Sequence, residues 1–210
     1  MTKVNKIIKY LILTDIAFWT GWGFITPIFA IFIVDKIVGG NALVVGIATA
    51  VYWFSRSLLV FPFGLILDKH EGEKDDYLFL VAGNFIVALT LFVYIFAIYP
   101  WHIYILQAFC GVGVAMSLGG WRAIFTRNID KGREATEWSL DDTFLSVGTA
   151  AAGVASGFVI VNFGYTFTFI FAGSLGILSV IILLSLRKEI QGVFNRDFYS
   201  NLMSIFKKIQ

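Results

Sequence analysis

The sequence predicts an all-α membrane protein, a bundle of six transmembrane helices. Two observations carry this prediction. Of the 210 residues, 58% are hydrophobic and 14% are charged, whereas about 25% of the residues of an ordinary soluble domain are charged. A helix needs about 20 apolar residues to cross a bilayer, so a chain of this length and composition holds about six spans joined by short connections.

Six apolar stretches are separated by polar connections, and each is long enough to cross a bilayer as a helix. They cover residues 8–34, 42–67, 77–99, 103–121, 140–161 and 165–186. A transmembrane β-barrel would instead show shorter segments of alternating polarity. Pro27 and Pro62 interrupt the first two stretches, and broken helices of this kind occur at the binding sites of transporters.

The positively charged residues gather on one side of the predicted bundle. Fourteen of the 16 lysines and arginines fall at the two termini or in the connections of that side. Positive connections remain in the cytoplasm, so both termini are predicted to be cytoplasmic and the protein to be integral to the cell membrane. In residues 187–210 apolar side chains recur at spacings of three and four, which predicts an amphipathic helix on the cytoplasmic leaflet. A disordered tail is the alternative.

Composition and motifs exclude several classes of function. A net charge of +2 offers no surface that could neutralise phosphates, so no nucleic acid is expected as a partner. The chain lacks the H-E-x-x-H, C-x-x-C and G-x-S-x-G motifs, and His70 and His102 fall on opposite sides of the membrane. We therefore expect no enzyme activity, no cofactor and no metal site. Cys110 is the single cysteine, which excludes an intramolecular disulfide.

Two charged residues, Asp15 and Arg56, lie inside predicted spans. A charge at that depth costs a few kcal/mol on insertion scales and usually has a function. The pair predicts a polar pathway for a substrate or an ion, in which Asp15 takes a proton or cation and Arg56 anchors an anionic group. A static salt bridge between two helices is the alternative. The other residues assigned to this pathway, which are also compatible with simple packing, are Trp19, Trp22, Tyr52, Trp53, Gln107 and Trp121.

Glycines in the fourth and fifth stretches recur among other small residues. Such spacing lets helices approach closely in a membrane. The residues assigned to helix packing on this ground are Gly111, Gly113, Gly148, Gly153 and Gly157.

The connection after the second stretch carries the most specific motif of the chain. It contains Gly64, Asp68, Lys69, Gly72 and Lys74. These residues resemble the loop signature G-x-L-x-D-R-x-G-R-K of the major facilitator superfamily, with lysine for the first arginine and one additional residue before the second glycine. The resemblance implies that they form a cytoplasmic gate, whose charged contacts hold the inner side closed in one conformation. A solvated charge cluster is the alternative.

Further segments extend this resemblance over residues 8–186. Residues 107–113 are similar to the fourth-span pattern R-x-x-Q-G-x-G, with both glycines in place and Gln107 in the position of the arginine. Residues 130–135 resemble the basic loop that precedes the fifth span. In the same region Ser139 and Asp142 predict an amino-terminal cap for the fifth helix.

Members of this superfamily usually carry two six-helix halves related by an axis along the membrane normal. This chain supplies one such half. The sequence therefore predicts a half-size transporter of a small solute that works by alternating access, as a homodimer or with a second six-helix half. A front half of a longer gene product is a further alternative. A non-transporting membrane scaffold or assembly partner is the alternative function.

Overall fold

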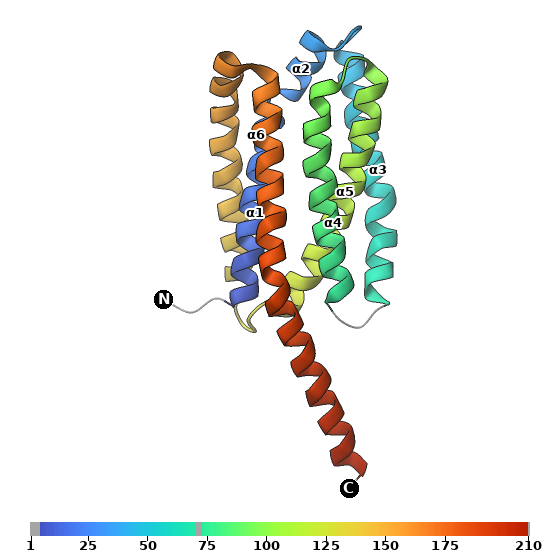
Figure 1. Ribbon diagram of the computed structural model, residues 1–210, viewed down its shortest axis with the longest axis vertical. Helices are drawn as coiled ribbons and strands as arrows, with labels where there is room; N and C mark the ends of the chain where they lie inside the picture. Colours follow the sequence, from blue (N-terminus) through green and yellow to red (C-terminus); the bar gives the residue numbers. More distant parts are fainter. Residues whose placement is uncertain (1–4, 70–72, 210) are drawn as a thin grey trace.

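The computed structural model describes the backbone of residues 5–69 and 73–209, and the side chains of these segments up to Arg187. Every regular element in these segments is a helix (Figure 1). The elements, in chain order, are α1 (Lys6–Ile25), α2 (Phe29–Lys36), α3 (Ala42–Asp68), α4 (Lys74–Val93), the 3-10 helix η1 (Tyr94–Phe96), α5 (Pro100–Asn128) and α6 (Glu134–Ile209).

Helix α6 consists of two limbs that meet at Gly164. The backbone there has φ 77° and ψ 178°, a region that glycine enters without the steric penalty of a Cβ. Figure 1 shows that α6 doubles back at one end of the bundle, and that its C-terminal part leaves the bundle at the other end. The turn predicted between the fifth and sixth apolar stretches therefore lies at this glycine.

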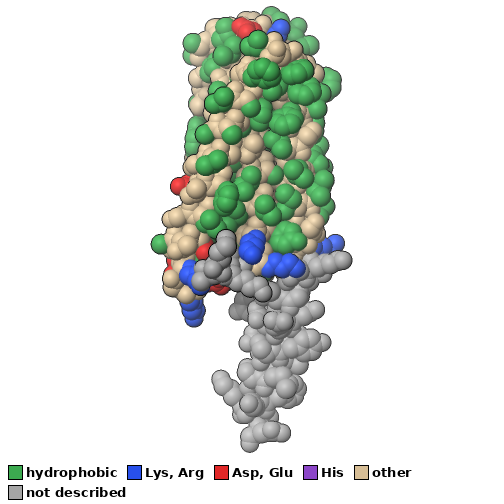
Figure 2. Space-filling model, turned by 90° about the vertical axis from the view of Figure 1, so that its left-hand side faces the viewer, with side chains coloured by type: hydrophobic (Ala, Val, Ile, Leu, Met, Phe, Trp, Pro, Cys, Tyr) green, Lys and Arg blue, Asp and Glu red, His purple; other side chains and the backbone are tan. Residues whose placement is uncertain are grey.

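Several helices have the length and apolar character needed to cross a membrane. Within the described residues they are α3, α4 together with η1, α5, and the part of α6 from Glu134 to Arg187, which contains the reversal at Gly164. Helices α1 and α2 meet the same criterion only as a pair, which is bent by 42°. Figure 2 shows apolar side chains along most of the height of one face, with charged side chains gathered chiefly at the end that carries the tail.

The two prolines within predicted spans behave differently. The first stretch breaks between Ile25 and Phe29, around Pro27, whose ring carries no N–H and crowds the preceding turn. Helix α3 instead continues through Pro62 to Asp68. The tail prediction concerns side chains outside the described residues, although the backbone of α6 is helical as far as Ile209.

Two helices extend further into the charged connections than their apolar stretches indicate. Helix α5 ends at Asn128, so Arg122 and Arg127 lie on a helix and not in a loop. Helix α6 begins at Glu134, so the predicted cap at Ser139 and Asp142 is wrong. Hydropathy marks the part of a helix that lipid surrounds, and a helix can continue beyond that part into water.

The helices pack in two groups that α4 joins. Helix α1 packs chiefly on α6, α3 packs chiefly on α5, and α4 contacts both α5 and α6. Buried polar side chains reinforce the join between the groups. Ser117 of α5 donates a hydrogen bond of 2.6 Å to Asn84 of α4, and Asn84 donates one of 3.2 Å to Ser179 of α6. Since α1 and α3 belong to different groups, a space remains between them.

The glycines of α5 and α6 differ in how closely neighbouring helices approach them. A Cβ on Gly111 would lie 2.7 Å from the carbonyl oxygen of Tyr52 in α3, and one on Gly113 would lie 2.9 Å from the carbonyl oxygen of Gly83 in α4. A Cβ on Gly148 would lie 2.7 Å from the hydroxyl of Thr20 in α1. A Cβ on Gly153 or Gly157, by contrast, would meet no described atom within 4 Å.

Candidate functional site

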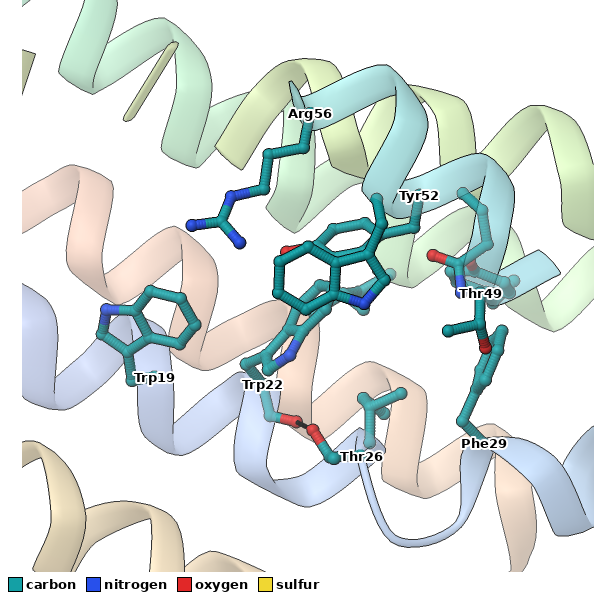
Figure 3. A pocket seen from close by; sticks show the side chains of 12 residues that line it. Trp19, Trp22, Thr26, Phe29, Thr49, Tyr52 and Arg56 are labelled. Carbon is teal, nitrogen blue, oxygen red and sulfur yellow. Dashed lines mark hydrogen bonds between the residues drawn. The ribbon is translucent and has the colours of Figure 1, made fainter. Parts of the chain in front are cut away.

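A cavity of about 340 Å³ occupies the space between α1 and α3. It lies within the size range of small-molecule sites. The side chains around it come from α1, α2, α3, α4, η1 and α5 (Figure 3). They are Trp19, Trp22, Ile25, Thr26, Phe29, Thr49, Tyr52, Trp53, Arg56, Leu91, Tyr94 and Gln107.

Helical periodicity places the α3 side chains on one face. Thr49, Tyr52, Trp53 and Arg56 stand at positions i, i+3, i+4 and i+7, which share one side of a helix. Trp19 and Trp22 of α1, with Thr26 directly after its last residue, follow the same rule. The cavity is therefore the space between two aromatic helix faces. Six of the residues assigned to the pathway line it: Trp19, Trp22, Tyr52, Trp53, Arg56 and Gln107.

The aromatic rings form much of the wall. The rings of Trp22 and Tyr52 are 5.5 Å apart between centroids and link α1 to α3 across the cavity. The ring of Phe29 meets that of Tyr94 edge-on at 5.9 Å. The hydroxyls of Thr26 and Thr49 donate hydrogen bonds to carbonyl oxygens of their own helices, those of Trp22 and Val45. The walls are thus mainly apolar surface.

Arg56 is the charged residue of the wall. Its guanidinium projects from α3 toward the side of α1 that carries Trp19 and Trp22 (Figure 3). The guanidinium carbon lies 4.8 Å from the centre of the Trp53 ring, a cation–π contact. The Nε atom is buried and has no hydrogen-bond partner. In the part of the chain that the structure describes, no carboxylate forms an ion pair with Arg56.

Asp15 is not among the residues that line the cavity, although it lies one helical turn before Trp19 on the same face of α1. Its carboxylate is within hydrogen-bonding reach of the Trp19 side chain and interacts electrostatically with Asp141 of α6. Asp141 is 6% exposed, and its Oδ1 atom has no hydrogen-bond partner. Trp19 thus contacts both the cavity and Asp15, while the salt bridge between Asp15 and Arg56 is not formed in the described residues. The ion-pathway role of Asp15 stays a prediction.

Trp121 is also placed away from the cavity. It is buried in a hydrophobic cluster formed by α1, α4, α5 and α6. Its ring stacks on Phe125 with centroids 4.5 Å apart and meets Trp138 edge-on at 5.5 Å. Its indole nitrogen is buried without a hydrogen-bond partner. The arrangement is that of a core residue, and its pathway role stays a prediction.

Two residues of the loop motif line a second cavity, of about 380 Å³, near the start of the connection between α3 and α4. Gly64 and Asp68 of α3 line it together with Arg122 and Arg127 of α5. Lys69 follows the last residue of α3 and Lys74 begins α4, while Gly72 lies outside the described residues. The structure brings acid and base together here, and their function as a gate stays a prediction.

A network of polar contacts adjoins this second cavity. Arg127 forms an ion pair and a hydrogen bond with Asp76, whose side chain is fully buried. Asn128 donates a hydrogen bond of 2.6 Å to Glu73. These contacts tie the end of α5 to the start of α4, a role that the loop motif did not reveal.

Phe29, Thr49, Leu91 and Tyr94 line the first cavity although the sequence did not single them out. Thr49 carries a usable signal, because it shares the helical face of Tyr52 and Arg56. The others come from helices whose apolar residues look alike on every side. As for metals, the described residues hold no group of three or more His, Cys, Asp or Glu side chains placed to bind an ion.

The comparison with known proteins identifies the family. The sequence profile of the Major Facilitator Superfamily matches residues 11–200. The chain belongs to this superfamily. The resemblance drawn from the loop motif is therefore confirmed. Its members are membrane proteins, in agreement with the long apolar helices found here.

One relative matches nearly the whole chain. An uncharacterized MFS-type transporter of Methanocaldococcus jannaschii is 25% identical over 197 residues, which cover 94% of this chain and 49% of the relative. The chain thus spans about half the length of the relative that it matches. This proportion agrees with one six-helix half of a superfamily member.

Proposed function

We propose that this chain forms half of a small-solute transporter of the Major Facilitator type, which works by alternating access. The second half is another copy of the chain in a homodimer, or a separate six-helix unit. The cavity between α1 and α3 lies on the transport pathway. The bundle crosses the cell membrane six times, with one span from α1 and α2 together and one from each limb of α6.

The observation that carries the proposal is the exposure of α3. Of its most apolar stretch 17% is buried, against 44–56% for the corresponding stretches of α4, α5 and α6. Arg56 lies near the middle of this helix, about 18 Å from its end at Asp68 at 1.5 Å per residue. Exposure of an arginine to lipid hydrocarbon at that depth is energetically unfavourable. A second protein unit that closes the cavity side removes this cost.

Two copies of this chain can be arranged with two-fold symmetry, as a homodimer requires. An even number of spans places both ends of each copy on the same side, so two copies lie parallel around an axis along the membrane normal. In Figure 1, α3 and the first limb of α6 lie at opposite edges of the bundle. A two-fold axis beside the cavity brings α3 of one copy against this limb of the other. Gly153 and Gly157, which have open space around them, lie on that limb.

Cross-linking between two differently tagged copies tests this arrangement. One copy carries Ser57→Cys and the other Gly153→Cys, each in a Cys110→Ala background. Ser57 is exposed on α3, and the space around Gly153 is open. Oxidation in the membrane is expected to join the two tags. The matched control carries Leu178→Cys, an exposed position on the second limb of α6, in place of the Gly153 change.

Two results would overturn the homodimer. One is equal cross-linking of the control pair, which indicates random collision. The other is a native mass spectrum that contains only monomers in mild detergent while solute flux is retained in liposomes. Cross-linking confined to the Ser57 and Gly153 pair supports it.

A further inference from the structure

The first cavity has an unbalanced charge. Of its twelve lining residues, Arg56 alone is charged at neutral pH. The remaining polar atoms of the wall belong to hydroxyl, indole and amide groups. Asp15, the carboxylate assigned to the pathway, does not line the cavity. The cavity is therefore cationic, and this charge selects the sign of its ligand.

The guanidinium of Arg56 has capacity for a further partner. Its Nε atom is buried and has no hydrogen-bond partner among the described residues, and the guanidinium lies against the face of Trp53. A buried donor that lacks an acceptor is unfavourable, and an arginine near the middle of a span adds to that cost. A carboxylate satisfies the planar fork of an arginine through two parallel hydrogen bonds. An anionic ligand would supply the hydrogen-bond acceptor and the negative charge that no described residue gives to Arg56.

A second polar group lines the same cavity. The side chain of Gln107, on α5, is 7% exposed. None of the residues that the structure describes forms a hydrogen bond with its amide. An amide offers both donors and an acceptor. Gln107 and Arg56 thus supply two polar groups in the wall of one cavity, on two neighbouring helices, and neither side chain has a hydrogen-bond partner among the described residues.

The rest of the wall fits the apolar part of a ligand. The rings of Trp22 and Tyr52 pack against each other in the cavity wall, and Phe29 and Tyr94 extend the aromatic surface. Aromatic faces favour flat or hydrocarbon groups and add specific edge and stacking contacts. The wall thus combines a broad apolar surface with two polar groups.

We propose that the cavity binds an organic anion, with its carboxylate on Arg56 and Gln107 and its apolar body among the aromatic rings. The inference rests on the proposed function, because it names the class of solute that the transporter carries. Inorganic anions fit less well, since they leave the aromatic wall without a partner. Organic cations are excluded by repulsion from Arg56.

Three probes with one apolar body test the proposal on the full chain in lipid nanodiscs. They are phenylpropionate, phenylpropanol and phenylpropylammonium, which differ in charge. Titration calorimetry is expected to show that the carboxylate binds about tenfold or more tightly than the alcohol, as an ionic hydrogen bond implies. The ammonium compound is expected not to bind. Equal affinity for the alcohol, preference for the ammonium compound, or no binding of any probe would overturn the proposal.

Substitution of Arg56 locates the site. Arg56→Gln is expected to reduce carboxylate affinity about tenfold or more, to the level of the alcohol, and Arg56→Lys is expected to retain part of it. Arg187→Gln removes the same charge from an exposed position and is expected to leave binding unchanged. Unchanged affinity in Arg56→Gln, or equal loss in Arg187→Gln, contradicts the proposed site. If Arg56→Gln does not fold, the selectivity of the unaltered protein among the three probes still decides the anion class.

The two proposals can fail separately. Carboxylate selectivity without cross-linking between copies overturns the homodimer and supports the anion site. Specific cross-linking without carboxylate selectivity supports the homodimer and overturns the anion site.

Discussion

Helices α3 and α5 pack against each other, and their most apolar stretches have the same mean hydropathy. Their environments nevertheless differ. Of this stretch 17% is buried in α3 and 56% in α5. Hydropathy reports the transfer of a side chain out of water and does not distinguish lipid from protein as its destination. With equal mean hydropathy, α5 is therefore a core helix and α3 an exposed one.

An arginine on each helix shows the functional side of this difference. Arg127 of α5 is paired with the buried carboxylate of Asp76. Arg56 of α3 has no ion pair within the described residues and lines a cavity. The paired charge ties α5 to α4, whereas the other charge is left for a ligand. The comparison predicts that substitutions on α5 reduce the stability of the fold, while equivalent substitutions on α3 affect binding or association.

The largest effect is expected from a glycine of α5. In Gly120→Ala the new Cβ would lie 2.1 Å from the carbonyl oxygen of Asp76, which is backbone and cannot move aside alone. Helices α4 and α5 must separate, at a cost of about 3 kcal/mol. Thermal unfolding measures this loss through a thiol-reactive dye, since Cys110 is buried in the fold.

Gly46→Ala on α3 is the matched control. A Cβ at this position meets no described atom within 4 Å, so stability is expected to be unchanged or to rise by about 0.5 kcal/mol from the better helix propensity of alanine. Equal destabilisation by the two alanines would contradict the comparison.

The next effect concerns the two arginines. Arg127→Met leaves the Asp76 carboxylate buried without its cation and is expected to cost about 2 kcal/mol, below the range of a fully buried pair, because the side chain of Arg127 is 39% exposed. Arg56→Met removes a charge that has no ion pair in the described residues, so the melting temperature is expected to stay constant or rise. Both are measured by thermal unfolding in one detergent.

A double variant tests the cause of this second effect. Asp76→Asn combined with Arg127→Met removes the buried charge and is expected to recover part of the lost stability. A loss in Arg56→Met as large as that in Arg127→Met would show that Arg56 also has a structural partner.

The smallest effect is expected from a hydroxyl of α5. Ser117→Ala removes the hydrogen bond to Asn84 and is expected to cost about 1 kcal/mol. Ser57→Ala on α3 changes an exposed hydroxyl and is expected to change stability by less than about 0.5 kcal/mol. Chemical unfolding curves of the two variants measure both changes in stability. A larger loss in Ser57→Ala than in Ser117→Ala would contradict the prediction.

The sequence located several helices closely. The stretch 42–67 corresponds to α3, and the turn expected after the fifth stretch lies at Gly164. Both are set by local physics, namely the length of an apolar run and the freedom of glycine at positive φ. The ends of α5 and the start of α6 were less predictable, because charged residues such as Arg127 and Glu137 continue a helix beyond its apolar part.

The candidate site was predictable in part. Thr49, Tyr52, Trp53 and Arg56 share a helical face, and that spacing is present in the sequence. Trp19, Trp22 and Gln107 were also assigned to the pathway and line the same cavity. Leu91 and Tyr94 were not assigned to it, because their apolar stretch gives no sign of which side faces the cavity. Asp15 illustrates the limit, since its place in α1 gave its depth but not that it is absent from the cavity wall.

The sequence by itself determined a helical membrane protein of the Major Facilitator Superfamily, with an acid and a base among apolar spans. Those properties follow from composition, the length of the apolar runs and the loop motif. Only the tertiary structure decided that Arg127 is paired, that Arg56 lines a cavity with Gln107, and that Asp15 lies elsewhere. The physical reason is that lipid and protein interior are both apolar, so the direction in which a helix turns its charge depends on packing between helices.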